Sequence, residues 1–383
     1  MSGPDANRTF AIVAGGGTVG HVAPGVAIAR ALVDRGHPSE TIHFVGSARG
    51  VEATRVPDAG FEVTLLPGRG IQRRLTLDNV AAVAGLVKAF AQSLLLVRRL
   101  RPSVVVAMGG YASVPCALAA VIWRVPLVVA EQNAVPGLAN RLLGRFAKAC
   151  AVSFPGTDLP RAVHTGNPVR AEVLAVHRST DRDVARAKLG VPDDRTLITA
   201  FGGSLGARRV NEAVLAASAG AWRERSDLAV RHIIGDRDWD RHAAELPQPS
   251  PDGLAYEAIR YEEDMPTVLA ASDLVVCRSG ASSVAEIAAV GVGSVLVPLP
   301  GAPGDHQTAN AAELQAAGAA ILVADAALDG PTLADRVAGI VGVDGRTEEM
   351  AAAAASCGRR DAADAVADLV MRHARAESDR GPR

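Results

Sequence analysis

The chain has 383 residues, 49% of them hydrophobic and 38 of them glycine, so it can bury two sizeable cores and we expect two domains. Its formal net charge is −1, from 40 basic and 41 acidic residues, which excludes a global field that attracts nucleic acid. We expect no signal peptide, because the N-terminus has no basic region followed by a long apolar core and a small-residue cleavage site. We also expect no spanning helix, because the most apolar long stretch, residues 80–97, contains Lys88. The four cysteines lack metal-ligand spacing and are typical of buried thiols in a reducing cytosol: Cys116, Cys150, Cys277 and Cys357.

Short apolar runs alternate with helix-length segments along the whole chain. These runs are too apolar to have a solvated face, which is typical of parallel sheets covered by helices on both sides. The expected strands lie within residues 10–14, 41–46, 62–67, 103–110, 126–132, 148–154, 196–203, 230–235, 273–280, 294–300 and 319–324. The predicted fold class is therefore α/β.

The arrangement of strand, glycine turn and helix at residues 10–32 recurs at residues 196–218. A polar segment that follows Pro168 separates the two halves, so we place the first domain at residues 8–169 and the second at 170–345. A final helix within 360–376 is expected to pack back on the first domain. Two Rossmann-like, doubly wound domains would place both glycine loops at strand ends around one cleft.

The first glycine loop reads AGGGTVGHVAPG, residues 14–25, and its glycines fit G-x-G-x-x-G. A dehydrogenase would carry an acid at the end of its second strand, whereas this chain has Val45-Gly46-Ser47 there. The loop is therefore a phosphate cradle or only a tight turn. The second loop, GGSLGARR at residues 202–209, offers backbone N–H groups and the Ser204 hydroxyl at a helix N-terminus.

Further polar residues follow other predicted strands. Glu286, in CRSGASSVAEIAAVG, either closes a capping box with Ser283 or binds a nucleotide ribose, and spacing alone favours the cap. His306 and Gln307 precede a helix and can hydrogen-bond sugar hydroxyls. His21 is the candidate general base, because imidazole titrates near neutrality, and Glu131 and Tyr111 are further catalytic candidates.

Taken together and in order, seven motifs resemble the MurG family: GGTVGHVAPGVAIA, GGYASVP, EQN, GNPVR, GGSLGAR, CRSGASSVAEIAAVG and DHQTANA. The resemblance spans residues 9–320 and implies a GT-B fold. It implies inverting transfer of N-acetylglucosamine (GlcNAc) from UDP-GlcNAc to the C4 hydroxyl of undecaprenyl-diphospho-MurNAc-pentapeptide. The family usually has Gly at the position of Val19 and His at the position of Ala130.

The same resemblance implies the substrate contacts. Ser204 would meet the diphosphate, Glu286 the ribose, and Asn133 and Gln307 the sugar, while the uracil would lie near Glu262. The resemblance thus reverses the capping interpretation of Glu286. The full implied set is Thr18, Val19, Gly20, Asn133, Arg170, Ser204, Glu262, Ala281, Ser282, Ser283, Glu286 and Gln307.

The departing UDP develops negative charge, which backbone N–H groups, a helix dipole and Arg170 can stabilise. We therefore expect no metal and no cofactor. Asp236-x-Asp238 has the spacing of a metal motif but lies outside the strand-end loops, and we interpret it as a surface turn.

A lipid-linked acceptor implies contact with the cytoplasmic face of the plasma membrane. Apolar residues recur at helical spacing between two groups of arginines, as expected of a peripheral patch, although periodicity alone favours a helix buried against the sheet. The apolar members are Val80, Val83, Ala84, Val87, Ala91, Leu94 and Leu95, and the basic ones are Arg69, Arg73, Arg74, Arg98, Arg99 and Arg101.

Two other functions remain open at this point. A UDP-GlcNAc 2-epimerase of the same fold would share the nucleotide-sugar site but would need no lipid-facing patch. A non-catalytic subunit that binds the nucleotide sugar would keep Glu286 and Ser204 without depending on His21.

Overall fold

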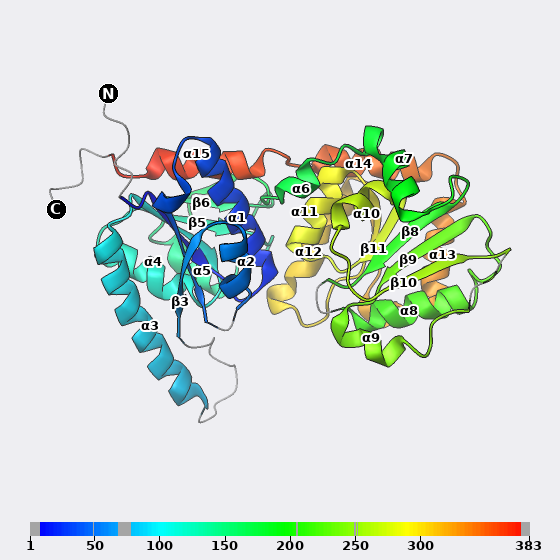
Figure 1. Ribbon diagram of the computed structural model, residues 1–383, viewed down its shortest axis with the longest axis horizontal. Helices are drawn as coiled ribbons and strands as arrows, with labels where there is room; N and C mark the ends of the chain where they lie inside the picture. Colours follow the sequence, from blue (N-terminus) through cyan, green and yellow to red (C-terminus); the bar gives the residue numbers. More distant parts are fainter. Residues whose placement is uncertain are drawn as a thin grey trace. The chain divides into compact units, whose positions relative to one another are not determined.

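A computed structural model describes residues 8–48, 50–67, 78–203, 206–248, 250 and 252–376, apart from the side chains of Val19 and of residues 78–84. The chain divides into two compact units (Figure 1). Unit 1 comprises residues 1–170 and 360–383, and unit 2 comprises residues 171–359. Unit 2 thus extends beyond residue 345, where we expected the second domain to end.

The described part of unit 1 contains a seven-stranded sheet in which all neighbouring strands are parallel. Apolar residues cover both faces of this sheet, because alternate side chains of its central strands enter two separate hydrophobic clusters. In sheet order the strands are β3 (Glu62–Leu66), β2 (Ile42–Ser47), β1 (Ala11–Gly15), β4 (Val104–Gly109), β5 (Leu127–Glu131), β6 (Ala149–Val152) and β7 (Ala162–His164).

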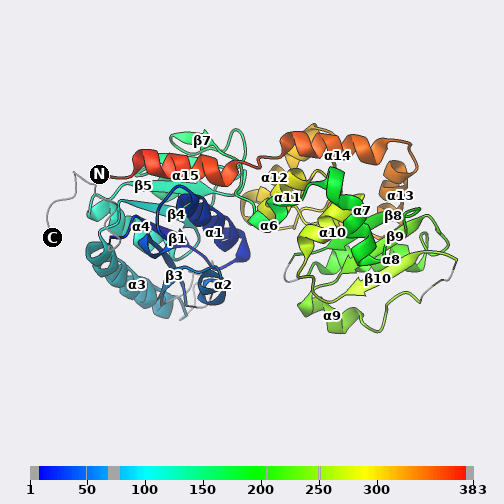
Figure 2. The ribbon, with the colours of Figure 1, turned by 45° about the horizontal axis from the view of Figure 1, so that its top comes forward.

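Helices cover the sheet of unit 1, and one of them comes from the far end of the chain. Helix α15 lies beside α1 in Figures 1 and 2, and Val366 and Val370 enter the same cluster as Ile28. Arg35 pairs with Asp364 at 2.5 Å across this contact. The helices are α1 (Val19–Asp34), η1 (Ser39–Thr41), α2 (Glu52–Asp58), α3 (Asp78–Leu100), α4 (Ser113–Ile122), α5 (Leu138–Gly144) and α15 (Ala362–His373).

Unit 2 repeats this architecture with a six-stranded parallel sheet in its described residues. Its strands in sheet order are β10 (Ala255–Ile259), β9 (Leu228–Ile233), β8 (Thr196–Phe201), β11 (Leu274–Cys277), β12 (Gly293–Leu296) and β13 (Ala320–Leu322). Its helices are α6 (Ala171–Leu174), α7 (Arg178–Leu189), α8 (Arg208–Ala219), α9 (Asp236–His242), α10 (Met265–Ala271), α11 (Ala281–Val290), η2 (Pro303–Asp305), α12 (His306–Ala316), η3 (Asp325–Ala327), α13 (Gly330–Val341) and α14 (Arg346–Cys357).

The α/β fold class with two parallel sheets is confirmed, and each predicted strand segment overlaps a strand. The prediction missed β7 and β10. Both are edge strands without fully buried residues, so they lack the continuous apolar run that marks a central strand.

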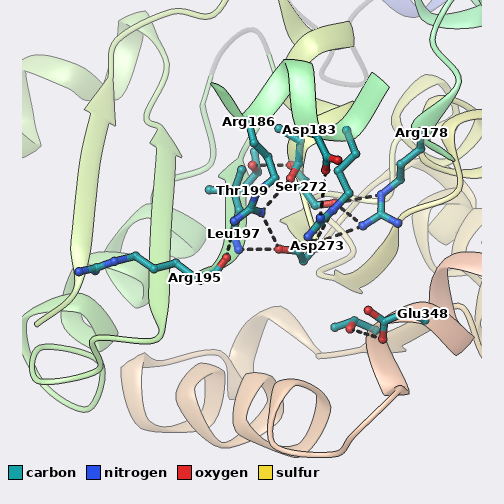
Figure 3. A network of polar contacts seen from close by, with 12 residues as sticks. Arg178, Asp183, Arg186, Arg195, Leu197, Thr199, Ser272, Asp273 and Glu348 are labelled. Carbon is teal, nitrogen blue, oxygen red and sulfur yellow. Dashed lines mark hydrogen bonds and ion pairs between the residues drawn. The ribbon is translucent and has the colours of Figure 1, made fainter. Parts of the chain in front are cut away.

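A charged cluster fastens α7 to the sheet of unit 2 (Figure 3). Asp273, directly before β11, accepts hydrogen bonds from Arg178, Arg182 and Arg186 and from the backbone N–H of Leu197. The side chain of Arg186 is 1% exposed and that of Asp273 9%. The cluster lies at the amino end of β11, and it therefore supports the fold at the opposite end of the strand from the polar loops.

Candidate functional site

The strand order of unit 1 brings four polar loops together. Strands β2, β1, β4 and β5 are neighbours, and the chain reverses its direction of winding between β1 and β4, where parallel α/β sheets bind ligands. Close approaches confirm that the loops touch. A Cβ on Gly110 would collide with the Gly16 carbonyl, and one on Gly109 would lie 3.3 Å from His21 Nε2 and 3.2 Å from Asn140 Nδ2.

His21 occupies the first turn of α1 and is partly buried. Its Nδ1 lies 3.2 Å from Thr18 Oγ1. Burial lowers the pKa of His21, while the charges of Glu131 and Glu52 and a hydrogen bond with Gly16 act in the opposite direction. The ring is therefore neutral at pH 7 and can accept a proton.

Glu131 ends β5 and organises the loop that follows. Its Oε1 accepts from the backbone N–H of Asn133 at 2.9 Å and from Asn133 Nδ2 at 3.3 Å. Its Oε2 accepts from Gly137 N at 3.0 Å and from Asn140 Nδ2 at 2.9 Å. Four donors on one buried carboxylate favour a supporting role for Glu131 over proton transfer.

Three other predicted residues of unit 1 have clear positions. The Tyr111 hydroxyl donates to the Pro67 carbonyl at 3.0 Å, so this side chain ties the loop after β4 to the end of β3. Val19 and Gly20 open α1, and Val19 is not among the described non-glycine residues with positive φ.

Sequence reasoning missed two residues of this cluster. Glu52 is 2% exposed, and its Oε1 accepts from Gly17 N at 2.7 Å and from Ser47 N at 3.2 Å. Asn140 is also 2% exposed and joins Glu131 to the Ala130 carbonyl. The only signal for Glu52 was an acid shortly after the second strand, and no local pattern marks Asn140.

In unit 2 the corresponding loops follow β8, β11 and β12, again where the strand order reverses. After β8, Gly206 N donates to the Gly203 carbonyl at 2.9 Å and closes a turn. Both glycines have positive φ, +89° and +77°, which explains the residue type. Ser204 lies outside the described residues.

The surface-turn prediction for Asp236-x-Asp238 is wrong. Both residues belong to α9, and Asp238 is only 6% exposed because it packs beneath the glycine loop, where a Cβ on Gly206 would meet its carboxylate. Asp238 Oδ2 accepts from Asn211 Nδ2 at 3.3 Å, and Asn211 Oδ1 accepts from His232 Nε2 at 3.1 Å. This buried network supports the loop from below.

Helix α11 begins at Ala281 with Gly280 as its N-cap, so Ser283 and Glu286 already lie inside the helix. The capping-box interpretation from spacing is therefore wrong, and Glu286 is a partly buried residue with other interactions. The hydroxyls of Ser279 and Ser282 are buried without a hydrogen-bond partner among the described residues. No atom of the described residues lies within 4 Å of the position of a Cβ on Gly280, which leaves space for another molecule beside the backbone there.

The remaining predicted contacts lie on separate elements. Gln307, in the first turn of α12, accepts from Leu299 N at 2.9 Å and closes the proline-rich loop after β12. The carboxylate of Glu262 accepts hydrogen bonds from Arg231 at 2.6 Å and from Asp264 N at 2.9 Å. Arg170 is the last residue of the first segment of unit 1 and is partly buried.

Helix α3 carries an apolar surface stripe. Val87 is 63% and Leu95 68% exposed, and Arg98 lies 5.6 Å over the ring of Trp123, which follows α4. Among the described residues, no helix is long and apolar enough to cross a membrane. Arg69, Arg73 and Arg74 lie outside the described residues, as do the side chains of Val80, Val83 and Ala84.

The cysteine thiols form no disulfide. Cys116, Cys150 and Cys277 are buried, and burial raises the pKa of the Cys116 thiol to about 12 and that of Cys150 to about 11. These three thiols are packing groups, as expected, whereas Cys357 is only partly buried.

Comparison with known proteins identifies both units. The model of the glycosyltransferase family 28 N-terminal domain matches residues 11–152, and that of the C-terminal domain matches residues 197–366. A protein of Desulforudis audaxviator is 39% identical over 94% of this chain and 97% of its own length, and it is named UDP-N-acetylglucosamine--N-acetylmuramyl-(pentapeptide) pyrophosphoryl-undecaprenol N-acetylglucosamine transferase. A Nocardioides protein of the same name is 41% identical over 94% and 97% of the two chains.

Solved structures agree. The crystal structure of Acinetobacter baumannii MurG is 28% identical, covers 96% of this chain and 99% of its own, and superposes with a TM-score of 0.75. A UDP-N-acetylglucosamine 2-epimerase structure from Listeria monocytogenes is 15% identical and covers 96% of both chains with a TM-score of 0.69, which shows a shared fold alone.

Proposed function

The chain belongs to the MurG family of N-acetylglucosaminyltransferases, and we propose that it transfers GlcNAc from UDP-GlcNAc to the C4 hydroxyl of undecaprenyl-diphospho-MurNAc-pentapeptide. The observation that carries this proposal is identity of 35% or more to curated members along 94% of the chain. The epimerase alternative rests on fold alone and is not favoured.

Unit 2 is proposed to bind the donor. The N-terminus of α11 presents backbone N–H groups beside Gly280, and Ser279 and Ser282 bring hydroxyls that need a partner. A carboxylate at Glu286 accepts hydrogen bonds from ribose hydroxyls, and the Gln307 amide contacts the sugar. The Ser204 hydroxyl, in the loop that the Gly206 N–H closes by its bond to the Gly203 carbonyl, is proposed to meet the diphosphate.

The chemistry requires two actions at once. As the bond from the anomeric carbon to UDP breaks, negative charge grows on the β-phosphate and backbone N–H groups with the helix dipole stabilise it. The acceptor hydroxyl must lose its proton as it attacks, and His21 takes that proton because its ring is neutral at pH 7. Glu131 holds the neighbouring loop in place by its four hydrogen bonds.

We propose peripheral attachment to the cytoplasmic face of the plasma membrane through α3. The exposed stripe of Val87 and Leu95 lies on the same helix as Arg98 and Arg99, which suit an anionic lipid surface. Trp123 adds an amphipathic ring beside Arg98.

The test supplies UDP-GlcNAc with a lipid-linked muramoylpentapeptide analogue and follows disaccharide and UDP. We expect both products in equal amounts. Formation of an epimerised UDP-sugar without any disaccharide would refute the proposal and identify the chain as a UDP-GlcNAc 2-epimerase. The His21→Ala variant is expected to lose turnover while it keeps donor binding, and near-normal turnover would remove His21 from its role as the base.

A further inference from the structure

Glu52, the first residue of α2, places a buried carboxylate beneath the first glycine loop. One oxygen, Oε1, accepts from Gly17 N at 2.7 Å and from Ser47 N at 3.2 Å. Gly17 belongs to the loop after β1, and Ser47 is the last residue of β2. A single carboxylate therefore joins two strand ends whose chain positions are far apart.

The surrounding chain leaves room for this carboxylate. A Cβ on Gly16, Gly46 or Gly50 would collide with the Glu52 side chain, so all three positions require glycine while Glu52 stays in place. The second oxygen, Oε2, is buried and has no hydrogen-bond partner among the described residues. Burying a charge with so few donors is unfavourable, so the carboxylate needs a role beyond packing.

We propose that Glu52 is the positioning residue for His21, fixing the turn that carries Thr18 and supplying negative charge that stabilises the ring while it holds the acceptor proton. This inference rests on the proposed function of His21 as the base. Two observations support it: Thr18 Oγ1 lies 3.2 Å from His21 Nδ1, and Glu52 and His21 line one small cavity together with Gly15 and Gly46.

Among the residues that the structure describes, two carboxylates act on the His21 ring. Glu131 acts on it from the last residue of β5 and Glu52 from α2, and both oppose the lowering of the His21 pKa by burial. Glu131 is occupied by four hydrogen-bond donors, three of them from its own loop and one from α5. Thr18 and Asn140, which lie near the ring or its neighbours, are uncharged. Glu52 is thus the carboxylate that can be neutralised with the least disturbance of the β5 loop.

The test replaces Glu52 by glutamine, which keeps an oxygen for Gly17 N and removes the charge. The titration midpoint of the His21 ring, followed by NMR and assigned from its absence in His21→Ala, is expected to fall by about 0.5 pH unit or more. The kcat is expected to fall roughly three- to tenfold with little change in KM for either substrate, because a weaker base accepts the proton less readily. Glu62→Gln is the control, since Glu62 is exposed and contacts His43 instead.

An unchanged His21 midpoint in Glu52→Gln would overturn the proposal, even where His21→Ala abolishes turnover. If Glu52→Gln does not fold, Glu52→Asp serves, because it keeps the charge and withdraws the carboxylate from Gly17. The Glu52→Asp variant is expected to keep a His21 titration midpoint near the wild-type value and to lose part of its kcat. A midpoint that falls in this variant although the negative charge is retained would count against the proposal. A shifted His21 midpoint in Glu52→Gln together with an active His21→Ala enzyme would support the coupling between Glu52 and the His21 ring. It would reject only the proposed role of His21 as the general base.

Discussion

Replacing Asp273 by asparagine is expected to destabilise unit 2 by about 3 to 5 kcal/mol. The carboxylate accepts hydrogen bonds from three arginines and from Leu197 N, and its side chain is only 9% exposed. Asparagine keeps one acceptor oxygen but turns an NH2 group toward arginine donors. Arg186, at 1% exposure, is then left as a buried cation without its counter-ion, and this loss dominates the estimate.

The assay is urea unfolding followed by tryptophan fluorescence. A Trp123→Phe background removes the tryptophan of unit 1, so that the signal comes from Trp222 and Trp239 in unit 2. Trp222 is 2% exposed within the core and reports loss of packing directly. The change in unfolding free energy follows from the midpoint and slope of the transition.

Asp227→Asn provides the matched control. Asp227 also directly precedes a strand of the same sheet and pairs with Arg225 at 2.6 Å, but its side chain is 56% exposed. An exposed pair contributes about 0 to 1 kcal/mol because water screens it. If Asp273→Asn costs no more than Asp227→Asn, burial does not set the strength of the cluster and the reasoning fails.

Four further outcomes are expected. The kcat/KM of the wild type should fall as the pH drops below a midpoint under 6.5, because burial lowers the pKa of His21 and the protonated ring cannot act as a base; a midpoint above 6.5 contradicts this. Burial lowers the pKa of His232 to about 3, so below pH 6.5 the unfolded chain binds more protons than the folded one, and stability present above pH 6.5 is lost by up to about 1.4 kcal/mol per pH unit toward pH 3. His232→Gln should flatten that dependence in urea unfolding, and an unchanged slope would assign it to other groups. Glu286→Gln should raise the KM for UDP-GlcNAc about tenfold through loss of a charge-assisted hydrogen bond, with little change in the KM for the acceptor. The same KM for UDP-GlcNAc in the variant and the wild type would exclude the ribose contact. Leu95→Glu should weaken sedimentation with anionic vesicles while Val343→Glu, exposed on unit 2, should not, and equal binding of both variants would reject α3 as the membrane surface.

The sequence alone determined the fold class and the central strands. Buried parallel strands are apolar along their whole length, so each leaves a local run such as residues 103–110 that needs no tertiary information to recognise. The glycine loops were equally local, since a backbone that turns with positive φ at Gly109 or Gly203 requires that residue type. The order of these motifs along the chain was enough to identify the family.

Only the tertiary structure decided what the polar side chains do. Glu286 has the spacing of a capping box, but the helix begins earlier, at a residue whose position depends on the preceding strand. The sequence around Asp238 predicts a solvent-exposed side chain, whereas in the structure Gly206 packs against its carboxylate. Glu52 accepts a hydrogen bond from Gly17 N, and Asp273 accepts one from Arg186. Neither partner can be identified from the sequence, because burial and hydrogen-bond partners are set by segments that meet only in the folded sheet.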